Sequence, residues 1–375
     1  MSTGELTERQ AFLALNALPN IGPITLNRLL AELGDDPRAI FEAGAERLER
    51  VKGVGPVISA TLAGWREHFD LAREEERMAL AATDFVTRRD AAYPRLLREI
   101  DSAPIGLYRK GGYDFALPGV AIVGSRRTTL YGQGVAKKLG AELARAGFCV
   151  VSGLARGIDT AAHEGALSVG GRTAAVLGNG IDIIYPAENL GLYRRIEETG
   201  AILSEFPFAR RADKQSFAMR NRIVAGICEA VVVVESDVSG GSMITARFAG
   251  EQGRLIFAVP GRIDQATSAG CHQLIRDGAT LLTGVDDILS ELSYLDGLRP
   301  APIPEKAGGG TVLAAADLTE DERRVYGCFS GGAMVSPDAA AAHTGLGAAQ
   351  LSATLMMLEL KRLIVKRADG TFEAR

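Results

Sequence analysis

Short runs of valine, isoleucine, leucine and alanine recur from residue 117 onward, and helical stretches separate them. The predicted strands are residues 120–123, 148–151, 173–177, 201–204, 230–235, 255–259 and 280–282. Uninterrupted apolar runs of this length are typical of strands that are buried on both faces of a parallel sheet. Because predicted helices alternate with these strands, the sequence indicates a doubly wound α/β domain.

Further segments flank this domain on both sides. Residues 1–82 have helical apolar spacing and two short Gly-containing turns, at 18–23 and 51–56. A stretch rich in Pro, Gly and Ala has the composition of a linker, and three predicted helices and a hairpin follow it in winged-helix order. The expected organisation is a helical domain at 1–82, the α/β domain at 83–295, the linker at 296–316 and a winged-helix-like domain at 317–375.

The composition excludes several classes of protein. The longest aliphatic stretch, at 231–234, is far shorter than the roughly 20 residues of a membrane helix. The N-terminus lacks a basic segment followed by an apolar one, so we expect a cytoplasmic protein without a membrane partner. The four cysteines form no Cys-x-x-Cys pair and the four histidines lie far apart, so we expect neither a disulfide framework nor a metal site. The net charge of −4 neither requires nor excludes nucleic acid.

Four loops that follow predicted strands have the residue types of an anion site. Small residues let the backbone approach a phosphate, hydroxyl groups donate hydrogen bonds, and the next helix offers free N–H groups. One such loop is weak evidence, but four on one sheet edge favour phosphate binding. The candidate residues are Gly124, Ser125 and Arg126 in the first loop, Ser152 and Gly153 in the second, Asn179 in the third, and Gly241, Ser242 and Thr245 in the fourth.

The most basic segment lies at 206–222, between the fourth and fifth predicted strands. Aromatic rings alternate there with positive charges, as in proteins that bind single strands by neutralising phosphates and stacking bases. The alternative is a solvated loop and a helix start, with Phe217 in the core. The candidate residues of this segment are Lys214, Phe217, Arg220, Asn221 and Arg222, with Arg210 and Arg211 nearby.

Nucleotide-cofactor motifs are missing from the sequence. It contains no Gly-x-x-x-x-Gly-Lys-Ser/Thr, and Arg126 stands where Gly-x-Gly-x-x-Gly would need its second glycine. The second predicted strand ends in Ser152-Gly153 rather than in the acidic residue that would hold a ribose hydroxyl. We therefore expect no NAD, ATP or other cofactor.

Taken together, these motifs resemble those of the DprA/Smf family of DNA-processing proteins. The resemblance runs in order from about residue 90 to 285 and includes Tyr93-Pro94, Tyr185-Pro186 and Ser204-Glu205. Its longer motifs are Val120-Ala-Ile-Val-Gly-Ser-Arg126, Val151-Ser-Gly-Leu-Ala-Arg-Gly-Ile-Asp159, Arg220-Asn-Arg222, Ser242-Met-Ile-Thr245 and Ala258-Val-Pro-Gly261.

The resemblance implies an extended Rossmann-like domain and a protein without catalysis that acts as a dimer. It implies binding of incoming single-stranded DNA during natural transformation, loading of the recombinase RecA, and displacement of single-strand-binding protein. The implied DNA pocket uses Gly124, Ser125, Arg126, Lys214, Phe217, Arg220, Asn221, Arg222, Ser242 and Thr245.

The flanking domains resemble the family's accessory domains less sharply. The N-terminal turns are similar to helix-hairpin-helix or SAM-like modules, because Gly53-Val54-Gly55 fits the motif while Asn20 replaces the first glycine of the other copy. Contact with DNA and contact with protein both remain open for them. The third helix of the winged-helix-like domain, at 348–361, has no basic residue before Lys361, so interaction or dimerisation is at least as well supported as duplex binding.

The sequence is compatible with two enzymatic alternatives. Nucleoside-monophosphate phosphoribohydrolases share the broad fold, but their motif places Arg247 where the catalytic carboxylate belongs, which leaves Glu205 and Glu235 as substitutes. Asp159 and His163 lie one helical turn apart and could form a catalytic pair. We favour a structural role for them, in which Asp159 caps the helix and His163 packs or hydrogen-bonds within the domain.

Overall fold

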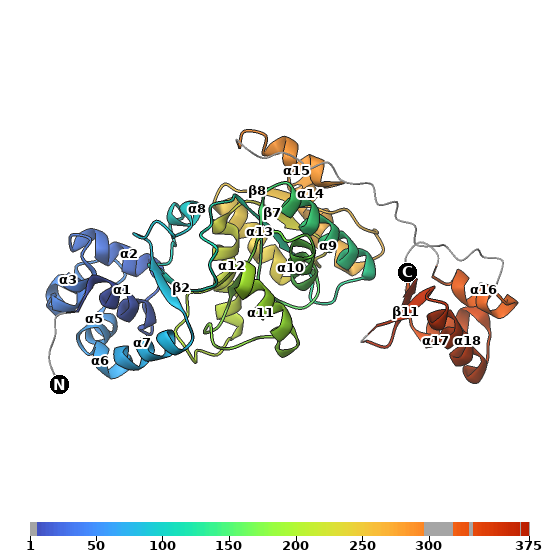
Figure 1. Cartoon of the computed structure of the whole chain (residues 1–375), viewed down its shortest axis with the longest axis horizontal. Helices are drawn as coiled ribbons and strands as arrows, with labels where there is room; N and C mark the ends of the chain where they lie inside the picture. Colours follow the sequence, from blue (N-terminus) through green and yellow to red (C-terminus); the bar gives the residue numbers. More distant parts are fainter. Residues whose placement is uncertain (1–5, 296–317, 330–332, 368, 375) are drawn as a thin grey trace. The chain divides into compact units, whose positions relative to one another are not determined.

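The computed structural model describes residues 6–295, 318–329, 333–367 and 369–374 (Figure 1). The predicted linker at 296–316 lies outside the described residues. The chain divides into two compact units: one contains residues 1–301 except 129–131, and the other contains residues 302–375 together with 129–131. The predicted boundary at 82/83 falls inside the first unit, between its last N-terminal helix and its first strand.

The first unit begins with seven helices, coloured blue in Figure 1. They are α1 (Glu8–Ala17), α2 (Pro23–Glu32), α3 (Pro37–Glu42), α4 (Ala45–Glu49), α5 (Pro56–Ala63), α6 (Trp65–His68) and α7 (Leu71–Leu80). The turn before α2 contains Asn20 at φ 63°, and the turn before α5 contains Gly53 at φ 97°. Asparagine can replace glycine in the first turn because it tolerates the left-handed conformation better than most residues.

A nine-stranded sheet follows. Its strands are β1 (Asp84–Thr87), β2 (Gly106–Lys110), β3 (Gly119–Val123), β4 (Cys149–Ser152), β5 (Thr173–Leu177), β6 (Ala201–Ser204), β7 (Cys228–Val233), β8 (Leu255–Ala258) and β9 (Thr280–Leu281). The strand order is β1-β2-β6-β5-β4-β3-β7-β8-β9, and all neighbours from β6 to β9 are parallel. The doubly wound fold is thus confirmed.

Helices cover both faces of this sheet. They are α8 (Arg95–Arg98), α9 (Leu130–Arg145), α10 (Ile158–Ser168), the 3-10 helix η1 (Ala187–Asn189), α11 (Leu190–Thr199), α12 (Lys214–Ile227), α13 (Gly241–Glu251), α14 (Ala266–Arg276) and α15 (Val285–Glu291). Alternate residues of one strand serve different cores: Val120 and Ile122 pack with α9, α10 and α15, whereas Ala121 and Val123 pack with α12, α13 and α14. This explains the uninterrupted apolar runs.

The strand order reverses between β3 and β7. The chain moves from β3 outward through β4, β5 and β6, and then returns through α12 to β7 on the other side of β3. Ligands of open α/β sheets bind at the carboxyl ends of the strands beside such a switch point. The first and fourth predicted loops follow β3 and β7, so they flank it.

Antiparallel strands β1 and β2 extend the sheet at the β6 edge and were missed by the sequence prediction. The N-terminal helices pack against this extension, because Phe12 and Leu15 of α1 share one apolar core with Phe85 and Tyr108. Glu74 of α7 is buried there and accepts hydrogen bonds from the Tyr108 hydroxyl at 2.8 Å and the Phe208 amide at 2.9 Å. Nearby, the Asn16 side chain donates to the Glu205 carbonyl at 2.7 Å.

The described part of the second unit has the winged-helix order that the sequence predicts. Its elements are α16 (Glu320–Gly327), β10 (Met334–Val335), α17 (Pro337–Thr344), α18 (Ala348–Leu360), β11 (Ile364–Lys366) and β12 (Phe372–Ala374). Leu351, Leu355 and Leu358 of α18 fill its core, while Met356 and Leu360 are exposed. Lys361, the first basic residue after α18, pairs with Glu322. In the described parts of the whole chain, no helix is long and apolar enough to cross a membrane.

Candidate nucleic-acid interface

The first two predicted loops hold each other at the switch point. The Ser125 amide donates to the Glu235 carbonyl at the end of β7 (2.6 Å), and the Ser125 carbonyl accepts from the Ile158 amide at the start of α10 (3.3 Å). Gly157 lies directly against this contact, with φ at 80° and a missing Cβ that would be 2.4 Å from the Ser125 carbonyl oxygen. Only glycine permits this close approach.

A serine turn shapes the tip of the first loop. The Ser125 hydroxyl donates to the Arg127 carbonyl at 3.1 Å and accepts from the Arg127 amide at 3.0 Å. The hydroxyl is thus engaged within the loop, contrary to its predicted role as a free phosphate donor. The turn leaves Arg126 and Arg127 exposed at the carboxyl edge of the sheet.

Two aromatic rings continue the surface from Arg126. The Arg126 guanidinium lies over the Phe217 ring, 5.1 Å from its centroid, and the Phe217 and Tyr185 rings are 5.5 Å apart. Tyr185 is 42 % exposed. The two rings also line a pocket of about 680 Å³ together with Asn179, Asp182 and Arg211. Flat rings beside guanidinium groups can stack unpaired bases while the cations meet the backbone.

Helix α12 brings Lys214 and Phe217 to this edge. It begins at Lys214, inside the basic segment at 206–222, because Asp213 caps it. The Asp213 carboxylate accepts from the Ser216 amide at 2.7 Å, and the Ser216 hydroxyl accepts from the Asp213 amide at 2.9 Å. The basic segment is therefore largely helix, and Lys214 and Phe217 lie in its first turn.

The early helix start corrects the expectation for Arg220. This side chain is only 4 % exposed, and its Nη1 donates to the Gly153 carbonyl at 2.8 Å and also to the Val176 carbonyl. Burial lowers the pKa of its guanidinium to about 10, against the opposing charge of Asp159. Arg220 therefore holds the second loop from below.

Arg222 is corrected in the same way. It is 1 % exposed, and its Nη2 donates to Glu205 at 2.6 Å. Its Nε and Nη1 have no hydrogen-bond partner among the described residues. A helix places residues two positions apart on different sides, so Arg220 meets the second loop while Arg222 meets the end of β6. Both guanidinium groups are buried and bind groups inside the protein.

Several other predicted residues are buried beneath the edge and support its loops. The hydroxyl of Ser152 donates to the Ile122 carbonyl, the amide of Asn179 donates to the Gly180 and Ile183 carbonyls, and the hydroxyl of Ser242 donates to Ser236. Gly153 and Thr245 are buried as well. At the surface the structure brings together Gly124, Ser125, Arg126, Lys214, Phe217, Asn221 and Gly241, with the Asn221 amide donating to the Gly241 carbonyl at 3.2 Å.

Asp159 and His163 do not form a pair for catalysis. The Asp159 carboxylate accepts from the Gly153 and Ala155 amides, so it fixes the loop before α10 rather than capping the helix, and burial raises its pKa. The Thr173 hydroxyl donates to the Val150 carbonyl, so His163 must donate from Nδ1 to Thr173. Burial lowers the pKa of His163 to about 3, which keeps the ring neutral. The structural role expected for His163 is confirmed.

Three exposed residues at this edge were not among the predicted binding residues. They are Arg127, Arg156 and Tyr185. Each stands inside or beside a motif that the sequence analysis singled out: Arg127 follows Arg126, Arg156 lies in the second loop, and Tyr185 precedes Pro186. Their exposure could not be derived from the sequence, because a loop has no periodic pattern of burial.

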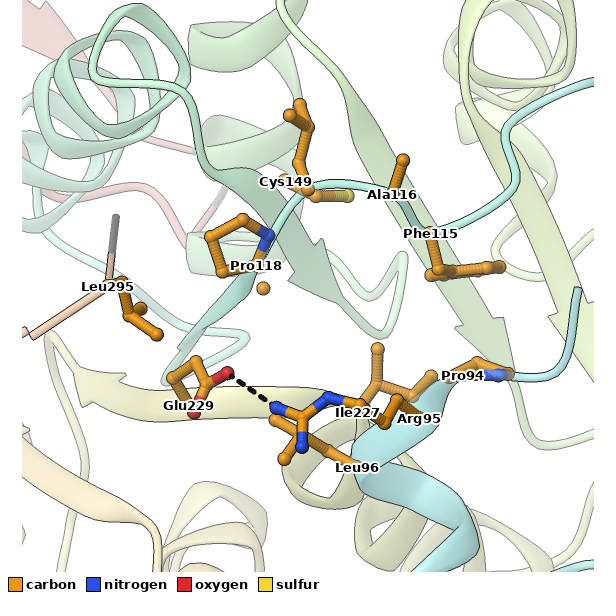
Figure 2. Close-up of a pocket in the computed structure, with 12 residues that line it drawn as sticks. Pro94, Arg95, Leu96, Phe115, Ala116, Pro118, Cys149, Ile227, Glu229 and Leu295 are labelled. Atoms are coloured by element: carbon orange, nitrogen blue, oxygen red, sulfur yellow. Dashed lines mark ion pairs between the residues drawn. The ribbon is translucent and has the colours of Figure 1, made fainter. Parts of the chain in front are cut away.

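A second pocket of about 230 Å³ lies at the opposite edge, where β3, β4 and β7 begin (Figure 2). Phe115, Pro118 and Ile227 line it together with an ion pair of 3.6 Å between Arg95 and Glu229. Ile227 ends α12, so a helix carboxyl end faces this region and disfavours anions.

The substitute carboxylates of the hydrolase alternative are both engaged inside the protein. Glu205 pairs with Arg222, and the buried Glu235 accepts from the Thr128 hydroxyl at 2.6 Å. Arg247, in the position of the missing catalytic carboxylate, is an exposed residue of α13 paired with Glu251. No observation favours that reaction.

Comparisons with known proteins identify the family of this chain. A family model described as DNA recombination-mediator protein A matches residues 84–293, and the DprA winged helix domain matches residues 311–370. Protein Smf of Synechocystis sp. is 37 % identical over 294 residues, which are 77 % of this chain and 74 % of that protein. DNA processing protein DprA of Streptococcus pneumoniae is 44 % identical over 206 residues, 55 % of this chain and 73 % of that protein.

Solved structures give the same result. The X-ray structure of DprA from Streptococcus pneumoniae aligns with a TM-score of 0.66 and 35 % identity, over 77 % of this chain and 99 % of that one. DprA from Helicobacter pylori, described for its single-stranded DNA binding mode, aligns with a TM-score of 0.51 and 31 % identity, over 56 % of this chain and 96 % of that one. The chain belongs to the DprA/Smf family of DNA-processing proteins.

Proposed function

We propose that this protein binds single-stranded DNA along the carboxyl edge of its sheet, with little preference for sequence. The observation that carries the proposal is the continuous surface of Arg126, Phe217 and Tyr185, with Lys214 in the first turn of α12. Single strands expose both their phosphates and the faces of their bases, so cations beside rings match them. Duplex DNA hides its base faces in the stack and offers this surface only phosphates.

The buried polar residues support the proposal in a different way from the one the sequence predicted. Arg220 and Asp159 bind opposite sides of the second loop, through the Gly153 carbonyl and the Gly153 amide respectively. Ser152, Asn179 and Ser242 anchor the ends of their strands in the same manner. A rim held this firmly loses little conformational entropy when a strand binds.

Other parts of the function rest on family membership. We infer that the protein acts in natural transformation, where it protects incoming DNA, loads RecA onto it and helps to displace single-strand-binding protein. We also infer a homodimer without catalytic activity. The DprA relative from Helicobacter pylori supports the DNA-binding step, since its structure is described by its single-stranded DNA binding mode.

The first test measures binding of a fluorescent oligo-dT by the full chain and by Arg126→Ala. A hydrogen bond to a charged group contributes about 1.5–3 kcal/mol, so affinity should fall roughly ten- to hundred-fold. The slope of log K against log salt should become shallower by about 0.7, because one phosphate contact is lost.

The matched control is Arg145→Ala. Arg145 is an exposed arginine in the last turn of α9, and that helix runs from the carboxyl edge to the opposite edge of the sheet. Its removal should leave oligo-dT binding unchanged. Equal loss in both variants would reduce the effect to net charge, and unchanged binding by Arg126→Ala would remove the first loop from the interface.

A further inference from the structure

Arg156 extends the cationic surface beyond Tyr185, but its guanidinium group is paired with the carboxylate of Glu188. Its Nη2 lies 3.1 Å from Glu188 Oε2, and its Nε contacts the other carboxylate oxygen. Tyr185 is close enough to add to the effect of Glu188 in raising the pKa of the Arg156 guanidinium. The edge thus presents Arg126, Phe217, Tyr185 and Arg156 in succession, and the last of these is paired.

The pairing state of Arg156 differs from that of Arg126 and Lys214, although Arg210 is also paired, with Asp213 at 2.7 Å. Among the described residues, neither Arg126 nor Lys214 has an acidic partner within ion-pair distance, whereas Arg156 is held by both oxygens of Glu188. The two side chains of the pair are each 53 % exposed, so solvent and salt reach them freely. An exposed pair of this kind contributes little to stability and opens readily.

The backbones that carry the pair are fixed. Asn189, next to Glu188, is buried and donates to the Leu154 carbonyl at 3.0 Å and the Thr160 hydroxyl at 2.9 Å. Asp159 fixes the Ala155 amide on the other side. Arg156 lies between Leu154 and Gly157, both of which have positive φ. Because both backbones are anchored, only the two side chains need to move for the pair to open.

We propose that Arg156 and Glu188 form an ion-exchange latch, in which Arg156 leaves Glu188 for a DNA phosphate when a single strand occupies the edge. The inference rests on the proposed function and adds two residues and a form of regulation to it. The guanidinium group loses one anionic partner and gains another that fits its paired donors equally well. Glu188 is left unpaired beside the strand, so it lowers the affinity and favours release.

The test compares oligo-dT affinity across wild type, Glu188→Gln, Arg156→Ala and the double variant, all as the full chain. Glu188→Gln should raise affinity, because Arg156 then binds phosphate without first breaking an ion pair. An exposed pair of this kind contributes little, so this gain should be about 1.4- to 5-fold larger with Arg156 present than in the Arg156→Ala background. In the Glu188→Gln background, Arg156→Ala should make the salt slope shallower by about 0.7.

Glu99→Gln is the control, since Glu99 forms a similarly exposed pair with Arg95 beside the pocket at the opposite edge. Its substitution should not alter binding. Equal gains from Glu188→Gln with and without Arg156 would show general repulsion by a carboxylate, and would overturn the latch. No gain at all would overturn it as well.

The failure of the latch can be told apart from failure of the proposed function. If wild type binds oligo-dT and Arg126→Ala loses binding while the four latch proteins show no coupling, only the latch is refuted. If wild type does not bind single strands, the proposed function fails and the latch fails with it.

Discussion

The buried position of Arg220 leads to a specific prediction about stability. Arg220→Met replaces the guanidinium with an unbranched apolar side chain, so the Gly153 and Val176 carbonyls lose a donor and Asp159 loses its nearest compensating charge. Removing one partner of a buried charged pair costs about 3–5 kcal/mol. That is a large part of the roughly 5–15 kcal/mol by which domains are stable.

Acid should partly restore the stability of Arg220→Met. Burial raises the folded-state pKa of Asp159 above the ordinary value of 3.8, and Arg220 opposes this rise. Without Arg220 the pKa of Asp159 in the folded protein rises further. A group with a raised folded pKa contributes its full stability below the pKa of the unfolded chain, and this stability is lost as pH increases through the folded pKa. The difference from wild type should therefore shrink between neutral and mildly acidic buffer.

The assay is denaturant unfolding of both proteins at several pH values, with oligo-dT binding measured alongside. Asp159→Asn combined with Arg220→Met should cost less than the sum of the two single changes and should lack the pH response. The reasoning would be refuted if Arg220→Met kept its stability within about 1 kcal/mol of wild type and lost DNA binding, because Arg220 would then act on DNA directly.

Two further predictions concern Gly157 and His163. Gly157→Ala should destabilise the protein by more than the about 1–2 kcal/mol of left-handed strain, because its Cβ would meet the Ser125 carbonyl. Gly134→Ala, in an open part of α9, should stabilise it by up to about 1 kcal/mol; equal melting temperatures would contradict the packing argument. Because burial lowers the folded pKa of His163 from 6.5 to about 3, stability should be full above pH 6.5 and fall with acidification by up to about 1.36 kcal/mol per pH unit. His163→Asn should unfold with a flatter pH dependence, and an unchanged slope would exclude His163 as its source.

The apolar pattern predicted the sheet well because both of its faces are covered. The boundaries of β5 and β6 match the predicted ones at 173–177 and 201–204. The apolar pattern did not predict strands β1 and β2, because they lie at the antiparallel edge of the sheet. Asp84 is exposed there, and Arg109 and Lys110 end β2. Such strands carry no continuous apolar run.

The candidate site was predicted only in outline, and α12 shows why. Arg220 and Arg222 occupy buried positions that apolar residues usually fill, so the helical pattern is hidden and the sequence predicts surface cations at both positions. The one sequence feature that indicates the start of this helix is Asp213 followed by Ser216, which form a capping box. Burial of a charged side chain depends on partners such as Gly153 and Glu205, which are far away in the sequence.

The buried Glu74 bears on how this protein can be divided. Its two partners, Tyr108 and Phe208, belong to β2 and to the segment that leads into α12. A fragment that starts at residue 83 would keep both partners and lose their shared acceptor, together with the apolar surface that α1 covers. The seven N-terminal helices thus support the edge of the sheet that is proposed to bind DNA, and a fragment made to study that edge should begin with them.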